Sequence, residues 1–205
     1  MEARKTLTHI NSRPFPSTVI RLPEGQSKHL PTNICEDKRR DALVPWTDRS
    51  ISNVVDGGGA VVVANDQSGE RVWEEFGWQV QEHNSHIGDI ELMAIAGALE
   101  AAIRNVRKQS DAGIRSVTIF SDSIEAISRY SNIRYFPKSC IDSLVRQRAQ
   151  ELVELCIRLS LIWVRSHGGV ERNHRAHSVA KNVATIPRSV DGIVDFGFHH
   201  ESPVP

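Results

Sequence analysis

The chain has few cysteines, no long apolar run and no excess of charge of one sign, and each of these absences argues against a class of protein. Its three cysteines, Cys35, Cys140 and Cys156, form no CxxC pair and no disulfide framework, which favours incidental thiols in a reducing compartment. No stretch approaches the roughly 18 apolar residues of a membrane span, and residues 1–16 lack the apolar core of a signal peptide. We therefore expect an intracellular protein, cytoplasmic or nuclear, with no membrane partner.

The charges balance, since 25 lysines and arginines stand against 25 aspartates and glutamates. A net charge of zero does not by itself indicate a nucleic-acid-binding protein, although a duplex requires only local basic patches. A basic face beside an acidic pocket is compatible with these totals. With 205 residues, 40% of them hydrophobic, the chain is long enough for one domain with tails.

The two ends of the chain differ from its middle. Residues 1–41 contain four prolines and show neither helical nor strand periodicity, so we predict an irregular N-terminal extension there. Residues 42–185 carry clear apolar patterns and are predicted to form the folded domain. Residues 186–205 return to a pattern-free composition and are predicted to be a C-terminal tail.

Apolar periodicity within the predicted domain alternates between strand and helix. A polar turn at 65–69 joins two of the strands, which predicts an antiparallel hairpin. Strands separated by helices tend to pair in parallel, so a mixed α/β sheet with helices on both faces fits the order of elements. The predicted strands cover 43–48, 57–65, 71–80, 116–120 and 161–165, and the predicted helices cover 91–108, 124–130, about 141–159 and 174–184.

Three carboxylates lie at ends of these elements. Asp48 is at the end of the first predicted strand, Asp122 directly follows the fourth, and Glu91 opens the first helix. Strand ends and helix starts converge at one edge of an open α/β sheet, so the three side chains are expected to meet there. Carboxylates grouped in this way repel one another, and a hard divalent cation such as Mg²⁺ resolves the conflict. Two such ions about 4 Å apart activate water and stabilise the leaving oxygen of a phosphodiester.

Each of these acids also has an ordinary structural interpretation. An aspartate after a strand is most often a cap or turn residue, and a glutamate at a helix start favours the helix dipole. The prediction of a metal centre therefore depends on the combination of the three acids with the sequence motifs around them.

Four segments together resemble the ribonuclease H type I family, over about residues 44–184. WTDRS resembles the family's TDGS motif, ELMAIAGALEAA its ELxAxxxAL helix, IFSDSIEAI its (T/S)DS motif, and WVRSHGGVERNHRAHSVA its WVxGHxGxxxNExADxxA ending. Each segment alone is a weak match, whereas all four in the right order and spacing are specific. The four segments are 46–50, 91–102, 119–127 and 163–180.

The resemblance implies an RNase H-like fold, with a five-stranded mixed sheet in the order 3-2-1-4-5 and helices on both faces. It implies a divalent-metal-dependent endonuclease that hydrolyses the RNA strand of RNA–DNA hybrids with two Mg²⁺ or Mn²⁺ ions. The subgroup that the chain most resembles is the domain carried by fungal non-LTR retrotransposons. The implied metal ligands are Asp48, Glu91, Asp122 and His177, the implied catalytic residues are these four and the mobile His167, and the implied substrate-binding residues are Arg49, Ser50, Ser123 and Asn173.

Several positions depart from the family pattern. His177 stands where the family has its fourth acidic ligand, and imidazole suits Mn²⁺ better than Mg²⁺. Arg49 replaces the glycine of TDGS, and His174 replaces the usual glutamate. The asparagines that commonly precede the catalytic glutamate are absent from 85–90, which bears on recognition of the RNA 2′-hydroxyl. Residues 138–148 show no clear basic protrusion, since their only cations are Lys138, Arg146 and Arg148.

These departures keep a second function open. The chain is alternatively a catalytically weakened RNase H-like module that binds nucleic acid or has a structural role in a mobile-element protein, and Arg49, His174 and His177 favour that interpretation.

Other interpretations are less favoured. A proofreading-type exonuclease would need an acid where Ser50 stands, and a DDE integrase would need its glutamate on a late helix. A zinc site of His167, His174 and His177 lacks a firm fourth ligand.

Overall fold

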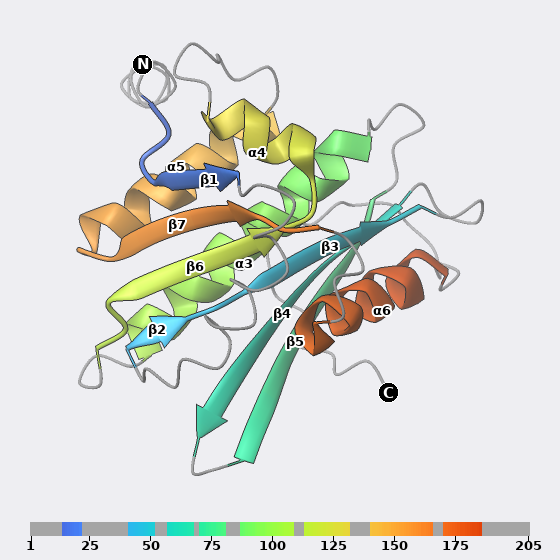
Figure 1. Ribbon diagram of the computed structural model, residues 1–205, viewed down its shortest axis with the longest axis horizontal. Coiled ribbons are helices and arrows are strands. Elements are labelled where there is room, and N and C mark those ends of the chain that lie inside the picture. The colour runs from blue at the N-terminus through green and yellow to red at the C-terminus, as the bar shows by residue number, and fades with distance from the viewer. Residues whose placement is uncertain are drawn as a thin grey trace.

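The computed structural model shows one mixed sheet with helices packed on it (Figure 1). Its description covers residues 14–21, 41–51, 57–67, 70–80, 87–108, 113–131, 140–165 and 170–185. The strands are β1 (Thr18–Arg21), β2 (Ala42–Leu43), β3 (Trp46–Ser50), β4 (Gly57–Gln67), β5 (Glu70–Val80), β6 (Ser116–Ser121) and β7 (Arg158–Trp163). The helices are α3 (Ile87–Lys108), α4 (Ile124–Ser131), α5 (Cys140–Glu154) and α6 (Glu171–Thr185).

The sheet runs in the order β1-β7-β6-β3-β4-β5, and β2 pairs separately with β6. The antiparallel pairs are β3 with β4 and β4 with β5, whereas β6 pairs in parallel with β3 and with β7. The five predicted strands therefore lie side by side in the predicted order, and the predicted hairpin is β4–β5. One further strand, β1, enlarges the sheet beyond the prediction, and β2 comes from the start of the first predicted strand.

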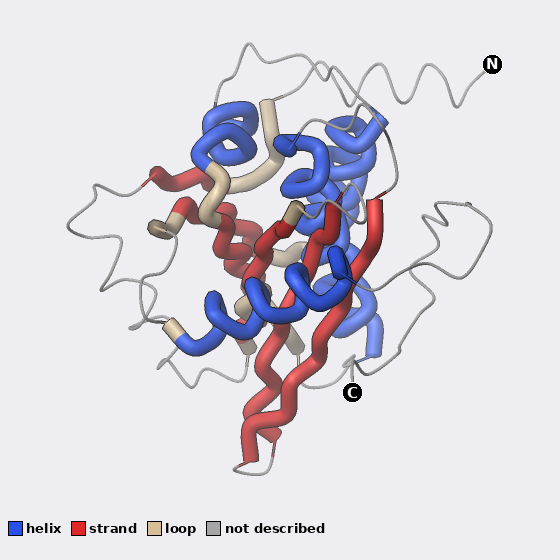
Figure 2. The backbone as a smooth tube through the Cα atoms, turned by 90° about the vertical axis from the view of Figure 1, so that its right-hand side faces the viewer, coloured by secondary structure: helices blue, strands red, loops and turns tan. Residues whose placement is uncertain are grey.

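Alternation along the strands divides the core between the two faces of the sheet. On β4, Val61 and Val63 join the larger core with residues of α3, α4 and α5, whereas Ala60 and Val62 join a smaller core with residues of α6. Successive side chains of a strand point to opposite faces, so α3, α4 and α5 cover one face and α6 covers the other. Figure 2 shows α6 lying across the strands on its own side. The prediction of helices on both faces is confirmed.

A glycine allows α6 to lie close to the sheet. A Cβ added at Gly58 of β4 would lie 2.6 Å from the backbone oxygen of Ala180 and 3.2 Å from the Cβ of Ala184. Both alanines are buried and belong to α6. The small residues on the two elements therefore fix how near α6 approaches β4.

The prediction that residues 1–41 are irregular is wrong for Thr18–Arg21. These four residues form β1, which pairs in parallel with β7, with Thr18 opposite Ser160 and Arg21 opposite Trp163. Just before β1, the ring of Phe15 stacks on Tyr130 of α4 with centroids 4.4 Å apart. The partner strand and this aromatic contact order a segment whose own periodicity is too short to indicate a strand. The domain boundaries otherwise stay predictions.

The first predicted strand, 43–48, is divided in two in the structure. Ala42 and Leu43 form β2, and Trp46–Ser50 form β3, with Pro45 between them. Proline has no N–H group to donate, which interrupts the ladder at this point. The carbonyl oxygen of Pro45 still accepts a hydrogen bond of 3.0 Å from the Phe120 backbone N–H, so the chain stays beside β6.

The predicted helix of about 141–159 is wrong at its end, because α5 ends at Glu154 and the chain enters β7 at Arg158, ahead of the predicted strand start at Leu161. Two other helices differ from the predicted ranges at their starts. Helix α3 begins at Ile87, ahead of the predicted start at Glu91, and α6 begins at Glu171. Within the part of the chain that the structure describes, no helix is both long and apolar enough to cross a membrane. Cys140 and Cys156 are free and exposed, and Cys35 lies outside the described residues, as does the tail 186–205.

Candidate metal centre

Two of the three predicted acids meet where β3 and β6 pair. The register of these strands places Trp46 opposite Phe120, and Asp48 and Asp122 each follow two residues later. Because the two strands are parallel and each aspartate lies two residues after this paired position, the two aspartates come side by side. A hydrogen bond holds each residue: the Arg49 backbone N–H donates to Asp48 Oδ1 at 2.7 Å, and the Trp163 side-chain Nε1 donates to the backbone oxygen of Asp122 at 3.0 Å.

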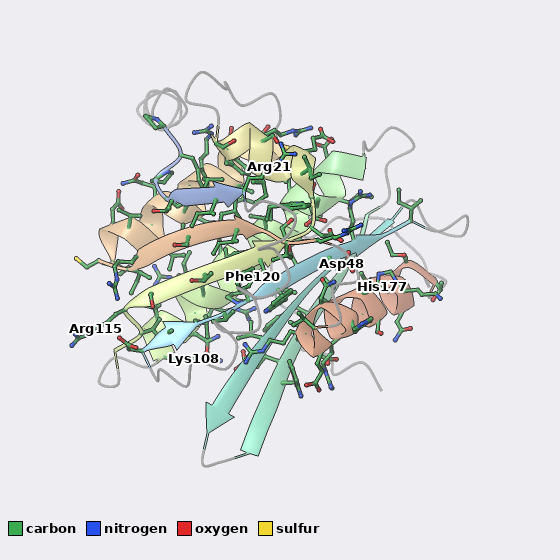
Figure 3. The ribbon with its side chains drawn as sticks, viewed as in Figure 1. Arg21, Asp48, Lys108, Arg115, Phe120 and His177 are labelled. Carbon is green, nitrogen blue, oxygen red and sulfur yellow. The ribbon has the colours of Figure 1, made fainter. Side chains whose placement is uncertain are left out.

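Asp48 faces the side of the sheet that α6 covers. Trp46, two residues earlier on the same face, belongs to the core that α6 closes. Nδ1 of His177 on α6 lies 3.0 Å from Oδ2 of Asp48, and Figure 3 shows the two residues close together where α6 passes β3. The Asp48 side chain is 8% exposed and that of His177 is 42% exposed, so the pair lies at the border between core and solvent.

Glu91 approaches from α3 on the opposite face. Thr47 and Arg49 flank Asp48 in the strand and so point toward this face. Glu91 Oε1 accepts a hydrogen bond of 2.6 Å from the Ser121 hydroxyl and one of 3.1 Å from the Thr47 hydroxyl. Glu91 Oε2 has no hydrogen-bond partner among the described residues, and the Arg49 Nε lies 3.6 Å from it.

The three acids form one compact group. Asp48, Glu91 and Asp122 each offer a carboxylate oxygen, and these oxygens all lie within 4.8 Å of one another. Among the described residues no other group of three or more His, Cys, Asp or Glu side chains has this property. The sequence-based prediction that these three acids meet is confirmed.

Burial makes Glu91 and Asp48 reluctant to ionise, and at Glu91 the neighbouring negative charges add to the effect. Burial raises the pKa of Glu91 from 4.5 to about 7, the Ser121 hydrogen bond opposes the rise, and the charges of Asp122 and Asp48 add to it. Burial also raises the pKa of Asp48, against the lowering effects of the Arg49 N–H and of His177. Such a cluster is stabilised by a cation, because a cation favours the ionised forms that burial disfavours.

The donor atoms fit a divalent ion. A buried carboxylate oxygen without a hydrogen-bond donor, Glu91 Oε2, lies beside two further carboxylates, and hard cations such as Mg²⁺ and Mn²⁺ prefer oxygen ligands. The imidazole of His177, whose Nδ1 lies within hydrogen-bond distance of Asp48, adds a nitrogen ligand, and Mn²⁺ accepts nitrogen ligands more readily than Mg²⁺ does. The residues present therefore fit the metal that the sequence predicts.

The remaining predicted site residues differ in their burial and in their contacts. Arg49 and Ser50 are partly buried at the end of β3, beside the acids. Ser123 is buried, and its hydroxyl accepts a hydrogen bond of 3.2 Å from the Ala126 N–H at the start of α4. Asn173 is buried in the first turn of α6. His167 lies outside the described residues.

Three residues that position the acids were not predicted from the sequence. Thr47 and Ser121 orient Glu91 through its Oε1, and Trp163 holds the backbone of Asp122. Thr47 and Ser121 are each the neighbour of a predicted acid on its strand, so alternation places them on the opposite face, toward α3. That positional signal was present in the sequence.

The two described cations of 138–148, the segment for which no basic protrusion was predicted, make contacts within the domain. Arg146 is buried, with its guanidinium carbon 5.8 Å from the Tyr130 ring centroid and 6.0 Å from that of Phe15. Arg148 forms ion pairs with Glu100 and Glu151 at 2.9 Å each. Lys138 lies outside the described residues. The two arginines therefore support α5 rather than a basic surface.

Solved structures show which fold this arrangement belongs to. LC11-RNase H1, solved in complex with an RNA/DNA hybrid, matches with a TM-score of 0.52 at 17% identity, over 69% of this chain and 96% of that chain. The chain has an RNase H-like fold. An N-terminal RNase H domain from Mycobacterium tuberculosis matches this RNase H-like domain with a TM-score of 0.51 at 17% identity, over 70% of this chain and 98% of that chain.

A third similar structure is LC9-RNase H1, a type 1 RNase H with the type 2 active-site motif. It matches the RNase H-like domain with a TM-score of 0.51 at 18% identity, over 80% of this chain and 81% of that chain. No family model and no curated protein matches the sequence. At these identities the likeness establishes the fold, and function has to be argued from the site itself.

Proposed function

We propose that this RNase H-like domain is a divalent-metal-dependent endonuclease that hydrolyses the RNA strand of RNA–DNA hybrids. The observation that carries the proposal is the group of Asp48, Glu91 and Asp122, whose carboxylate oxygens from three separate elements lie within 4.8 Å of one another. The hybrid bound to the similar LC11-RNase H1 supports the class of substrate.

Asp48, Glu91, Asp122 and His177 would hold Mg²⁺ or Mn²⁺. When bound, two such ions supply an activated water and stabilise the leaving oxygen of the phosphodiester. Asp48 is suited to contribute to both sides of the centre, because it lies near Glu91 and contacts His177 on the opposite face. Ser121 keeps one oxygen of Glu91 hydrogen-bonded and so leaves Oε2 directed to a cation.

The other roles are proposed on the family resemblance. His167 would assist proton transfer or product release. Arg49 and Ser50 lie beside the acids at the end of β3, where a phosphate of the RNA strand would approach. Ser123 and Asn173 would act near the substrate, and their burial supports a part in shaping the site. The origin of the domain in a fungal non-LTR retrotransposon stays a prediction.

Cleavage of a labelled RNA–DNA hybrid tests the proposal. The full chain should cut the RNA strand in Mn²⁺, more slowly in Mg²⁺, and not at all in EDTA. Asp122→Asn should reduce the rate by about a hundredfold or more, because it removes one of the charges that hold the ions. An equal rate in Asp122→Asn would contradict the assignment.

A second candidate is a catalytically weakened domain that binds hybrids without cutting them. The contact between Arg49 and Glu91 favours it, since a protein cation already lies at the acidic group. Hybrid binding in Mn²⁺ without any cleavage would support this candidate and exclude the first.

A further inference from the structure

Arg49 is a charged residue within the metal centre itself. Its Nε lies 3.6 Å from Oε2 of Glu91, a carboxylate that is fully buried. Guanidinium is charged at every pH that a protein tolerates. Among the described residues, Arg49 is the cation that pairs with Oε2, and the hydrogen bonds from the Ser121 and Thr47 hydroxyls both go to Oε1.

A divalent ion would need the same oxygen. Because Oε1 is hydrogen-bonded twice, Oε2 is the Glu91 atom available to a cation. An Mg²⁺ or Mn²⁺ ion binds a carboxylate oxygen at about 2.1 Å, which would bring it within a few ångströms of the guanidinium. Two cations at that separation repel strongly in a partly buried site. The Arg49 side chain is 28% exposed, so it has a path to solvent.

We propose that Arg49 is a built-in cation that occupies the Glu91 side of the metal centre in the metal-free protein and is displaced when a divalent ion binds. The inference rests on the metal centre of the proposed function, and it adds a residue that sets how tightly that centre binds its ions. Arg49 stabilises the apo protein and weakens metal binding by the same interaction. Removing its charge should therefore move these two properties in opposite directions.

The test is calorimetric titration of Mn²⁺ into the full chain and its variants, together with urea unfolding in EDTA. Arg49→Gln removes the charge and keeps hydrogen-bonding capacity, and it should bind Mn²⁺ about tenfold more tightly than the parent while being less stable in EDTA. Arg49→Lys keeps the charge and should stay within about threefold of the parent. Arg107→Ala removes an exposed arginine paired with Glu151, far along α3, and controls for net charge.

The outcomes separate this inference from the proposed function. If the parent binds Mn²⁺ and Arg49→Gln binds it equally or more weakly, Arg49 does not compete with the metal, and the metal centre stands. If neither binds Mn²⁺, the metal centre fails and the inference fails with it. Should Arg49→Gln be unfolded in EDTA, folding on addition of Mn²⁺ would support the inference, and failure to fold in Mn²⁺ would overturn it.

Discussion

Glu91 should make the metal-free protein less stable as the pH rises. Burial raises the pKa of Glu91 from 4.5 to about 7, so the folded protein keeps a proton that the unfolded chain releases. The stability contributed by this proton is fully present below pH 4.5 and is lost as the pH rises through 7. A shift of this size corresponds to a loss of about 3 kcal/mol in the free energy of unfolding.

Glu91→Gln should remove this dependence. Its amide oxygen would still accept the hydrogen bonds from Ser121 and Thr47, and its amide N–H₂ would resemble the protonated carboxyl beside Asp48 and Asp122. Without metal, the variant should match the parent at about pH 4, below the pKa of the unfolded carboxyl, and exceed it by up to about 3 kcal/mol at about pH 8.

Urea unfolding in EDTA at the two pH values measures the difference. Taking the variant minus the parent cancels the titration of groups that do not interact with Glu91. Glu154→Gln, at an exposed glutamate at the end of α5, serves as the control for the loss of one carboxylate. If the difference between Glu91→Gln and the parent is the same at both pH values, Glu91 does not carry the raised pKa and the reasoning is refuted.

Two further predictions concern α5 and α6. Cys156, just beyond α5, has a φ of 61°, a left-handed conformation that glycine adopts without strain. Cys156→Gly should therefore raise the free energy of unfolding by about 1 kcal/mol. An equal or lower free energy of unfolding in urea would contradict this. His177→Asp places a carboxylate beside Asp48 and should increase the cleavage rate in Mg²⁺ relative to Mn²⁺; an unchanged ratio of rates would show that His177 is not a ligand.

Local patterns in the sequence predicted most of the sheet because the relevant signals are themselves local. The continuous apolar runs of β4 and β6 and the apolar residues of β5 identify those strands without reference to their partners. The positions of Asp48 and Asp122 at strand ends followed directly from these assignments. Their proximity then required only that β3 and β6 be neighbours.

Features that depend on distant partners were not predictable in this way. The four residues of β1 become a strand through pairing with β7, and the break at Pro45 reflects how the chain lies beside β6. The contact of Arg49 with Glu91 depends on the depth at which α3 packs on the sheet, which periodicity does not give. His177 entered the predicted site through the family resemblance, and the structure places it beside Asp48.

Binding of Mn²⁺ to the full chain, measured by calorimetry at about pH 8, where Glu91 would be ionised, tests the metal centre most directly. We expect binding to the parent, loss of that binding in Asp122→Asn, and retention in Asp89→Asn, which changes a neighbouring aspartate in the first turn of α3 outside the acidic group. Absence of binding to the parent, or equal binding to Asp122→Asn, would contradict this expectation.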